Sequence, residues 1–269
     1  DYAGLFKIRR SDKMENKESV MEFGYIKPDL AYTFDVTYCP PGDNGNAEAT
    51  PTENLVSQYE MADGTDFSWN IHAANPYEGR EPRFYASINF NGQQWRGRQL
   101  EFWQGGKDGI NVSKVDYCCT GYLLRKTADE GVDVINGKGG MKEASILFRV
   151  GSLYLDYAEA LNEAEGPVDD VYKYVDAIRK RAGLPGLAKG LDKDKMRERI
   201  QHERQIELAF EAGHRYFDCH RWKIAEKTDN GYMHGMNITA TNKVDYSKRS
   251  TVGDSRVFEK KHYLFPIPQ

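Results

Sequence analysis

The sequence predicts a mainly α-helical protein in which a helical scaffold, residues 145–269, carries a loop-rich region with short β-hairpins, residues 1–144. Three observations favour this fold class. Apolar residues recur at helical spacing after residue 145. Glycine, asparagine, proline and tyrosine are frequent before it, as is typical of short strands and turns. The chain has 269 residues, 39% of them hydrophobic, which is enough for a substantial core. We expect the two regions to pack as one unit.

The N-terminal region contains three segments with recognisable patterns. Residues 29–38 alternate loosely and are expected to form a strand. Thr50, Pro51 and Glu53 form a capping box, which predicts a helix that continues to Gly64. Residues 84–90 alternate between apolar and polar side chains, and Asn91-Gly92 favours a tight turn, so residues 95–103 are expected to return as the partner strand of a β-hairpin.

The C-terminal region begins with two helical patterns separated by Gly166-Pro167. Because the connection is so short, we expect the two helices to pack antiparallel. A helix pair of about thirty-four residues has the size of a tetratricopeptide unit, and such a unit needs further helices to bury its faces. Gly166 and the small and branched residues after it are the only ones that match the consensus of such a unit, and they match it loosely. The expected buried face of the first helix holds Leu153, Tyr157, Leu161 and Ala164, and that of the second holds Val168, Val171, Tyr172, Val175, Ile178 and Ala182.

A third helix is predicted from Asp192 to about Ala212, with Asp192 as its N-cap and Gly213 as its stop. This helix carries more charges than one solvated face accommodates. Glu207 lies one turn from two other glutamates and therefore needs a cation from elsewhere in the chain. We expect a structural ion network with four members: Glu203, Glu207, Arg215 and Arg221.

Composition and motifs exclude several classes of function. The net charge is −4 and no basic run is present, so nucleic acid is not an expected partner. No apolar run is long enough to span a bilayer. His202-Glu203 begins like a zinc-protease helix, but Ile206 stands where the second histidine is required. The four cysteines lack zinc-site spacing and are expected to be free thiols. We therefore predict no metal and no cofactor, although calcium binding near Asp43 stays open.

Several stretches of the chain together resemble the SusD/RagB family. The resemblance is spread over nearly the whole chain, and it is specific in the combination of motifs rather than in any one of them. The stretches that carry it are residues 52–64, 82–85, 155–164 (LDYAEALNEA), 177–185 (AIRKRAGLP), 202–222 and 263–268 (YLFPIP).

The resemblance implies a tetratricopeptide-like scaffold decorated by loops, on a lipoprotein at the extracellular face of a Bacteroidetes outer membrane. Such proteins bind glycans, or in some members peptides, without catalysis, and they cover a TonB-dependent, SusC-like transporter that imports the ligand. The family's lipidated cysteine and first several helices have no counterpart here. The chain is therefore expected to be the C-terminal part of such a protein, attached to the membrane only through a lipid anchor that this sequence lacks.

Candidate glycan-binding residues follow from the chemistry of sugars. A sugar ring has an apolar face bordered by hydroxyls, so its site needs an exposed aromatic plane near amides, carboxylates or arginines. Aromatics of the N-terminal region that lie beside such groups in the sequence satisfy this requirement. The predicted ligand-binding residues are Tyr38, Asn44, Asn46, Trp69, Tyr77, Arg80 and Trp95.

Two other classes of function stay open at this point. A glycoside hydrolase would need two carboxylates on opposite sides of a sugar cleft, and the 41 acidic residues offer many pairs but select none. A helical-repeat module could instead bind a protein or a peptide on its concave face, with the aromatics in the core.

Overall fold

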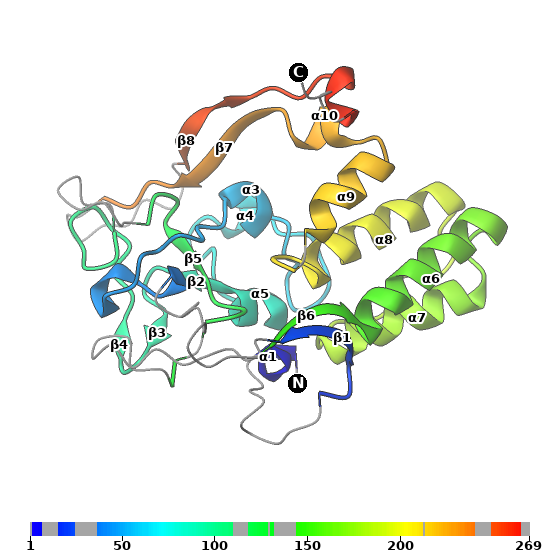
Figure 1. Cartoon of the computed structure of the whole chain (residues 1–269), viewed down its shortest axis with the longest axis horizontal. Coiled ribbons are helices and arrows are strands. Elements are labelled where there is room, and N and C mark those ends of the chain that lie inside the picture. The colour runs from blue at the N-terminus through cyan, green and yellow to red at the C-terminus, as the bar shows by residue number, and fades with distance from the viewer. Residues whose placement is uncertain are drawn as a thin grey trace.

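The fold has a helical side and a loop-rich side. Helices α6 to α9 lie together on the right of Figure 1, and the short strands and turns of the N-terminal region lie on the left. The mainly α-helical scaffold with a loop-rich region of short strand pairs is confirmed. The division at residue 144 stays a prediction. The computed structural model describes residues 2–6, 16–24, 37–109, 118–128, 130–131, 144–211, 213–239 and 249–264.

Three helices form the centre of the scaffold: α6 (Val150–Glu165), α7 (Asp169–Arg181) and α8 (Lys193–Glu207). Helix α6 packs against both α7 and α8. Asp192 caps α8, since its carboxylate accepts the backbone N–H of Lys195 at 2.8 Å. The predicted buried face of α7 is confirmed except at Val168, which precedes the first turn and is 37% exposed. The helices enclose a separate apolar cluster of Ala158, Val171, Tyr172, Val175, Met196 and Ile200.

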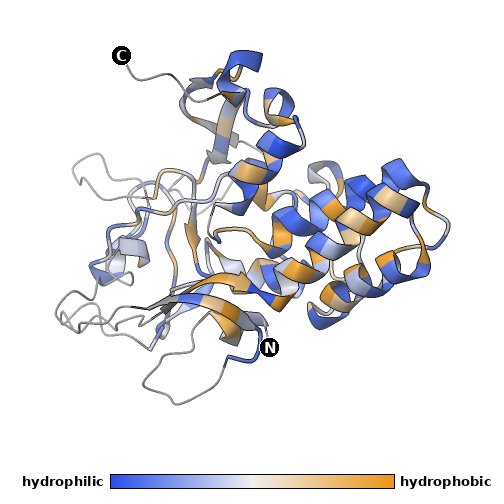
Figure 2. Ribbon diagram, turned by 45° about the vertical axis from the view of Figure 1, so that its right-hand side comes forward, coloured by the Kyte–Doolittle hydropathy of each residue, from blue (hydrophilic) through white to orange (hydrophobic). Residues whose placement is uncertain are grey.

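The predicted buried face of α6 is wrong except at Leu161, which packs against this apolar cluster. Leu153 and Tyr157 are 45% and 46% exposed. The helix has two apolar stripes, and the one that contacts α7 and α8 is offset from the predicted one. Figure 2 shows hydrophobic and hydrophilic residues side by side along these helices. The buried side chains of α6 are those of Ser152, Leu155, Ala158 and Asn162, with Gly151 also buried.

Helix α6 starts at Val150 and not at Ser145, because a strand precedes it. This strand, β6 (Ala144–Arg149), pairs antiparallel with β1 (Ser19–Gly24) near the N-terminus. A two-stranded pairing between such distant segments leaves no local signal in the sequence. It also ties the N-terminal region directly to the start of the scaffold.

The predicted hairpin of residues 84–103 is wrong. Residues Pro82–Ser87 form the helix α5, and the strand β2 (Ile88–Phe90) pairs with β5 (Tyr122–Leu124) instead. Pro82 at the first helical position fixes a backbone angle that suits a helix start. Its preference for a helix outweighed the preference for a strand that the alternating pattern indicated. The residues after the turn form a minimal hairpin of β3 (Gln94–Trp95) and β4 (Arg98–Gln99).

The predicted helix of residues 50–64 is also wrong in extent. Only α3 (Glu53–Val56) forms, and its N-cap residue is Thr52. Gly64 takes a positive φ of 83°, and a side chain at this position would collide with Pro185, so the chain turns here at a residue that has to be glycine. The predicted strand of residues 29–38 lies mostly outside the described residues; its last two residues, Thr37 and Tyr38, are in a helical turn.

The C-terminal elements lead back to the loop-rich side. Helices α9 (His214–Arg221) and α10 (Ala225–Thr228) precede a long hairpin of β7 (Gly231–Met236) and β8 (Arg249–Arg256), and the short η4 (Lys260–Tyr263) follows it. In Figure 1 this hairpin runs along the top of the molecule, and β7 packs against α3. The larger apolar core lies beneath it and includes Tyr59, Phe84, Trp95, Phe102, Tyr122, Ile206 and Met236.

Candidate functional site

Four side chains around α4 (Trp69–His72) form one packed group, which we call the α4 aromatic group: Phe67, Trp69, His72 and Arg80. The ring of Phe67 lies edge-on to Trp69, with ring centroids 5.2 Å apart, and stacks on His72 at 5.2 Å. The guanidinium of Arg80 lies 3.9 Å from the Phe67 centroid, on the inner side of the group. Trp69 and Phe67 are half-buried, and the neighbouring Ile71 is 76% exposed.

A buried carboxylate holds Trp69 in place. The indole Nε1 donates to Oε1 of Glu53 at 2.8 Å, and Oε2 of the same carboxylate accepts from the Tyr122 hydroxyl at 2.6 Å. Burial raises the pKa of Tyr122 well above its ordinary value, so the phenol stays a donor. A ring fixed in this way offers an aromatic plane with little entropy left to lose on binding. The sequence analysis missed Phe67 and Glu53 as part of this arrangement.

Arg80 is not available to a ligand, which corrects its predicted role. Its side chain is 2% exposed, and its guanidinium donates to the backbone carbonyls of Pro76, Val56 and Tyr59 at 2.6 to 3.0 Å. An arginine that satisfies so many backbone acceptors organises the turn around it. Arg80 therefore packs under the Phe67 ring as a buried structural residue of the α4 aromatic group.

Trp95 is the second predicted ligand residue that the structure places in the core. It is fully buried, and it packs in the larger apolar cluster with Leu100 and Phe102. Tyr77 is half-buried and packs against the same core, with its ring centroid 4.4 Å from that of Phe90. The glutamine and arginine residues next to these aromatics in the sequence did not distinguish them from core aromatics, which are common.

The remaining predicted residues lie on a different loop. Asn44 is exposed and takes a φ of 61° at the end of a 3₁₀ turn, while Asn46 donates from Nδ2 to Glu48 at 3.3 Å and Tyr38 is half-buried. Asp43 in that turn pairs with Arg98 at 3.1 Å. Within the described part of the chain, no three histidine, cysteine, aspartate or glutamate side chains are arranged to hold a metal ion.

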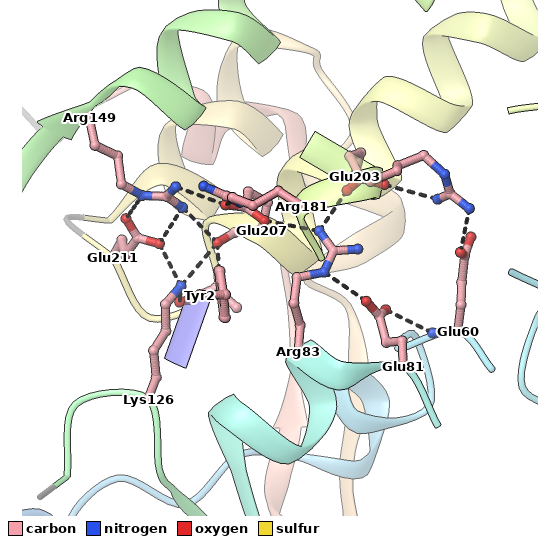
Figure 3. Close-up of polar contacts among 12 residues, drawn as sticks. Tyr2, Glu60, Glu81, Arg83, Lys126, Arg149, Arg181, Glu203, Glu207 and Glu211 are labelled. Carbon is pink, nitrogen blue, oxygen red and sulfur yellow. Dashed lines mark hydrogen bonds and ion pairs between the residues drawn. The ribbon is translucent and has the colours of Figure 1, made fainter. Parts of the chain in front are cut away.

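A second feature lies between the loop-rich region and the scaffold, where opposite charges are paired and, apart from the partly exposed Arg181, buried (Figure 3). We call it the buried ion cluster. The scaffold and the loop-rich region both contribute acids and bases to it, so the cluster joins the two regions. Its members in the figure include Glu60, Glu81, Arg83, Lys126, Arg149, Arg181, Glu203, Glu207 and Glu211, and Arg179 pairs with Glu60 and Glu203.

Glu207 is the centre of this cluster. Its carboxylate is 0% exposed and pairs with Arg149 at 2.8 Å, with Arg83 at 3.0 Å and with Arg181. Burial alone would raise the pKa of Glu207, but the guanidinium groups of Arg149, Arg181 and Arg83 outweigh it and hold the pKa well below its ordinary value. Glu203 lies beside it and pairs with Arg83 at 2.6 Å.

The predicted cations of Glu207 are wrong. Arg221 pairs instead with Asp218 at 2.8 Å and with Glu159 of α6. Arg215 is not among the partners of Glu207 in the described residues. The cause is the early end of α8: the chain turns after Glu207, and α9 carries both arginines away from the cluster.

Lys126 explains why α8 ends at Glu207 and not near Ala212. The ammonium donates to the carbonyls of Glu207 and Ala209 at 3.0 and 2.9 Å, so it satisfies the terminal acceptors of the helix. A cation at this position is also favoured by the helix dipole. Phe210 then takes a positive φ of 66°, which breaks the helical path. The Tyr2 hydroxyl donates to the same Glu207 carbonyl at 3.1 Å.

The chemistry of the two features differs. The carboxylates of Glu203 and Glu207 are 1% and 0% exposed and fully engaged by arginines, so they cannot reach a sugar and serve as structural groups. The α4 aromatic group is partly exposed and offers ring faces rather than reactive groups. None of the helices in the described ranges is both long and apolar enough to cross a bilayer.

The fold is similar to those of several solved structures. The chain is similar to a SusD-like carbohydrate-binding protein of Bacteroides fragilis, with a TM-score of 0.82 and 26% identity over 100% of this chain and 55% of that one. It is also similar to a second SusD-like protein of B. fragilis, with a TM-score of 0.77 and 29% identity over 98% of this chain and 53% of that one.

A curated relative shares a shorter segment. The SusD-like protein P25 of Formosa agariphila is 42% identical over 82 residues, which cover 29% of this chain and 15% of that protein. The chain thus spans about half the length of the solved structures it matches. The sequence profile described as the SusD family matches residues 10–269. This protein therefore belongs to the SusD family.

Proposed function

We propose that this protein binds oligosaccharides at the cell surface without catalysis and delivers them to a TonB-dependent, SusC-like transporter of the outer membrane. Membership of the SusD family and the similarity to a carbohydrate-binding relative support this function. The proposal places the protein at the extracellular face of the outer membrane, held by a lipid anchor outside these 269 residues.

The observation that carries the proposal is the fixed and partly exposed ring of Trp69. Its Nε1 is bound to a buried carboxylate, so the indole cannot rotate to hide its face. Polar side chains that suit sugar hydroxyls are exposed nearby in the sequence, at Asp66, Asn70 and Asn75. An aromatic plane beside polar groups is the arrangement that a sugar ring requires. We propose that the α4 aromatic group forms one part of the glycan site.

The test is glycan affinity in a pair of matched variants. Trp222 is the control, because it is also half-buried and its Nε1 also donates to a glutamate, Glu159, at 2.7 Å. We expect Trp69→Ala to weaken binding of the best ligand from a panel of gluco-, manno- and xylo-oligosaccharides by about tenfold or more. Trp222→Ala should bind as the unchanged protein does. Isothermal titration calorimetry measures both.

Equal affinities of the two variants would contradict the role of Trp69. If no member of a broad glycan panel binds to the protein as isolated from cells, the glycan function itself is wrong. Release of new reducing ends from a bound polysaccharide would favour a glycoside hydrolase instead. Capture of a peptide in place of a glycan would favour the peptide-binding function known for other members of the family.

A further inference from the structure

The three rings of the α4 aromatic group lie within residues 61–79, a segment that contains three acids and neither lysine nor arginine. The two ends of the segment lie side by side, because the N–H of Ala62 donates to the carbonyl of Gly79 at 2.8 Å. The segment thus forms a closed loop, and its exposed acids share a surface with its aromatic rings. We call these three carboxylates the acidic rim: Asp63, Asp66 and Glu78.

The acidic rim is negatively charged at neutral pH, because exposed carboxylates are ionised there. Thr65 holds Asp63 in this state, since its hydroxyl and its backbone N–H donate to Oδ1 at 2.7 and 2.9 Å and lower the pKa of the carboxyl. The side chain of Asp66, which directly precedes Phe67, is 83% exposed. The rings of the α4 aromatic group are therefore surrounded by charge of one sign.

The basic side chains that contact this segment are already engaged by the protein. Arg80 is 2% exposed and donates to three backbone carbonyls. Arg199 of α8 pairs with the buried carboxylate of Glu60 and lies 3.7 Å from Asp66. His72 accepts a backbone N–H through Nδ1 at 3.1 Å, and an imidazole that accepts at this nitrogen carries no charge. None of these three side chains offers an unshared positive charge to a ligand.

This balance of charge suits sugars that carry none. The hydroxyls of a neutral sugar donate to carboxylates and to amide oxygens, and Asn70 and Asn75 are exposed in the same segment. A uronic acid or a sulfate ester needs arginine or lysine instead, because its negative charge has to be paired. Beside the acidic rim such a group faces like charge, which weakens binding.

We propose that the site at the α4 aromatic group selects neutral oligosaccharides and rejects those that carry uronic acids or sulfate esters. The inference rests on the proposed glycan-binding function and adds the class of ligand to it. It also separates two sets of acids. The carboxylates of the buried ion cluster pair with arginines, whereas those of the acidic rim face the solvent in which a ligand arrives.

The experiment compares matched ligands on the protein as isolated from cells. Gluco-, manno- and xylo-oligosaccharides are each paired with a counterpart of the same length that carries a uronic acid, and isothermal titration calorimetry measures the affinities. We expect the neutral member of the best-bound pair to bind about tenfold or more tightly than its acidic counterpart.

The outcomes distinguish this inference from the function on which it rests. Equal affinities within the pairs, or tighter binding of the acidic members, would overturn the inference and leave glycan binding standing. If no member of any pair binds, the proposed function fails and the inference falls with it.

A charge reversal tests whether the acidic rim causes the selection. Glu78→Lys should lower the ratio between the neutral and acidic affinities by about threefold at low salt. The matched control is Glu165→Lys, which changes the net charge equally at the exposed end of α6, on the right of Figure 1, and should leave the ratio unchanged. Equal changes in the two variants, or no change in Glu78→Lys, would overturn the inference.

Salt provides a second test that needs no variant. An increase in NaCl from about 20 mM to about 500 mM screens the repulsion between the acidic rim and an anionic ligand. The affinity for the acidic oligosaccharide should rise by about threefold, while that for the neutral one stays constant. An affinity for the acidic ligand that stays constant or falls with salt would contradict the repulsion and overturn the inference.

Discussion

The buried ion cluster and the surface pairs at the outer end of the scaffold use the same chemistry in opposite surroundings. At the surface, Arg197 lies between Glu163 and Asp194, and these side chains are 35%, 40% and 84% exposed. In the cluster, Glu207 lies among Arg83, Arg149 and Arg181 with no exposure of its carboxylate. Both sites pair arginines with carboxylates, but only in the cluster is the central carboxylate buried.

The comparison shows that exposure, and not the number of pairs, decides what a charge contributes. A surface pair exchanges water for a partner at almost no net gain. A buried pair has lost its water already, so removing one partner leaves a bare charge in a medium of low dielectric. The cluster also specifies how the loop-rich region sits on the scaffold, because Arg83 from one pairs with Glu203 and Glu207 from the other.

The largest effect is expected for Glu207→Ala. Its removal leaves Arg83, Arg149 and Arg181 without their shared acceptor, and the free energy of unfolding should fall by about 3–5 kcal/mol. Urea denaturation followed by circular dichroism measures it. Glu198→Ala on the exposed side of the same helix is the control and should cost less than about 0.5 kcal/mol. Similar costs for the two variants would show that the cluster does not stabilise the fold.

The second-largest effect is expected in acid, which should lower the free energy of unfolding by protonating the carboxylates of the cluster. The arginines hold the pKa of Glu207 below its ordinary value of 4.5, and the pKa values of Glu211 and Glu60 are lowered as well, in each case against the effect of burial. A lowered pKa in the folded state contributes stability above the unfolded value, and that stability is lost as the pH falls below 4.5. For a buried carboxylate the loss is about 2–3 kcal/mol.

Glu81 opposes this trend, because burial raises its pKa. We expect the sum to favour loss in acid, since three lowered carboxylates stand against one raised carboxylate. Urea titrations from pH 6 to pH 3 measure the loss, and Glu207→Gln should flatten the curve. An unfolding free energy that stays constant over this range would contradict the ionic description of the cluster.

Lys126 predicts a change in the opposite pH range. Burial lowers its pKa from 10.5 to about 8, although Glu211 pairs with it. The unfolded chain binds more protons than the folded one between these values, so the contribution of Lys126 to stability rises from pH 8 to pH 10. Relative to Lys126→Met, the unchanged protein should gain about 2 kcal/mol over this interval. A constant difference between the two proteins would show that the lysine keeps its ordinary pKa.

The smallest effect is expected for Arg197→Ala at the surface. The variant breaks pairs with Glu163 and Asp194 that water already screens, and the free energy of unfolding should change by less than about 1 kcal/mol. The change should shrink further in 1 M NaCl, because salt screens exposed charges. A loss comparable to that of Glu207→Ala would remove the distinction between the two sites.

Local patterns in the sequence determined the features that depend on neighbouring residues. Asp192 predicted the start of α8, because a capping carboxylate acts on the next turn alone. The apolar spacing of Val171, Val175 and Ile178 predicted the buried face of α7, and Gly166 with Pro167 predicted its separation from α6. The excess charge on Glu203 and Glu207 also indicated that partners were needed within the protein.

Tertiary structure decided everything that depends on distant segments. The cations of Glu207 come from α5, β6 and α7, and no spacing rule links these positions to α8. Lys126 ends α8 from across the fold, and β1 converts residues 144–149 into a strand. Burial separated Trp95, which is in the core, from Trp69, which reaches the surface, although their sequence surroundings look alike. Hydrogen bonding along a helix is local, whereas burial and charge pairing depend on which chain segments meet in space.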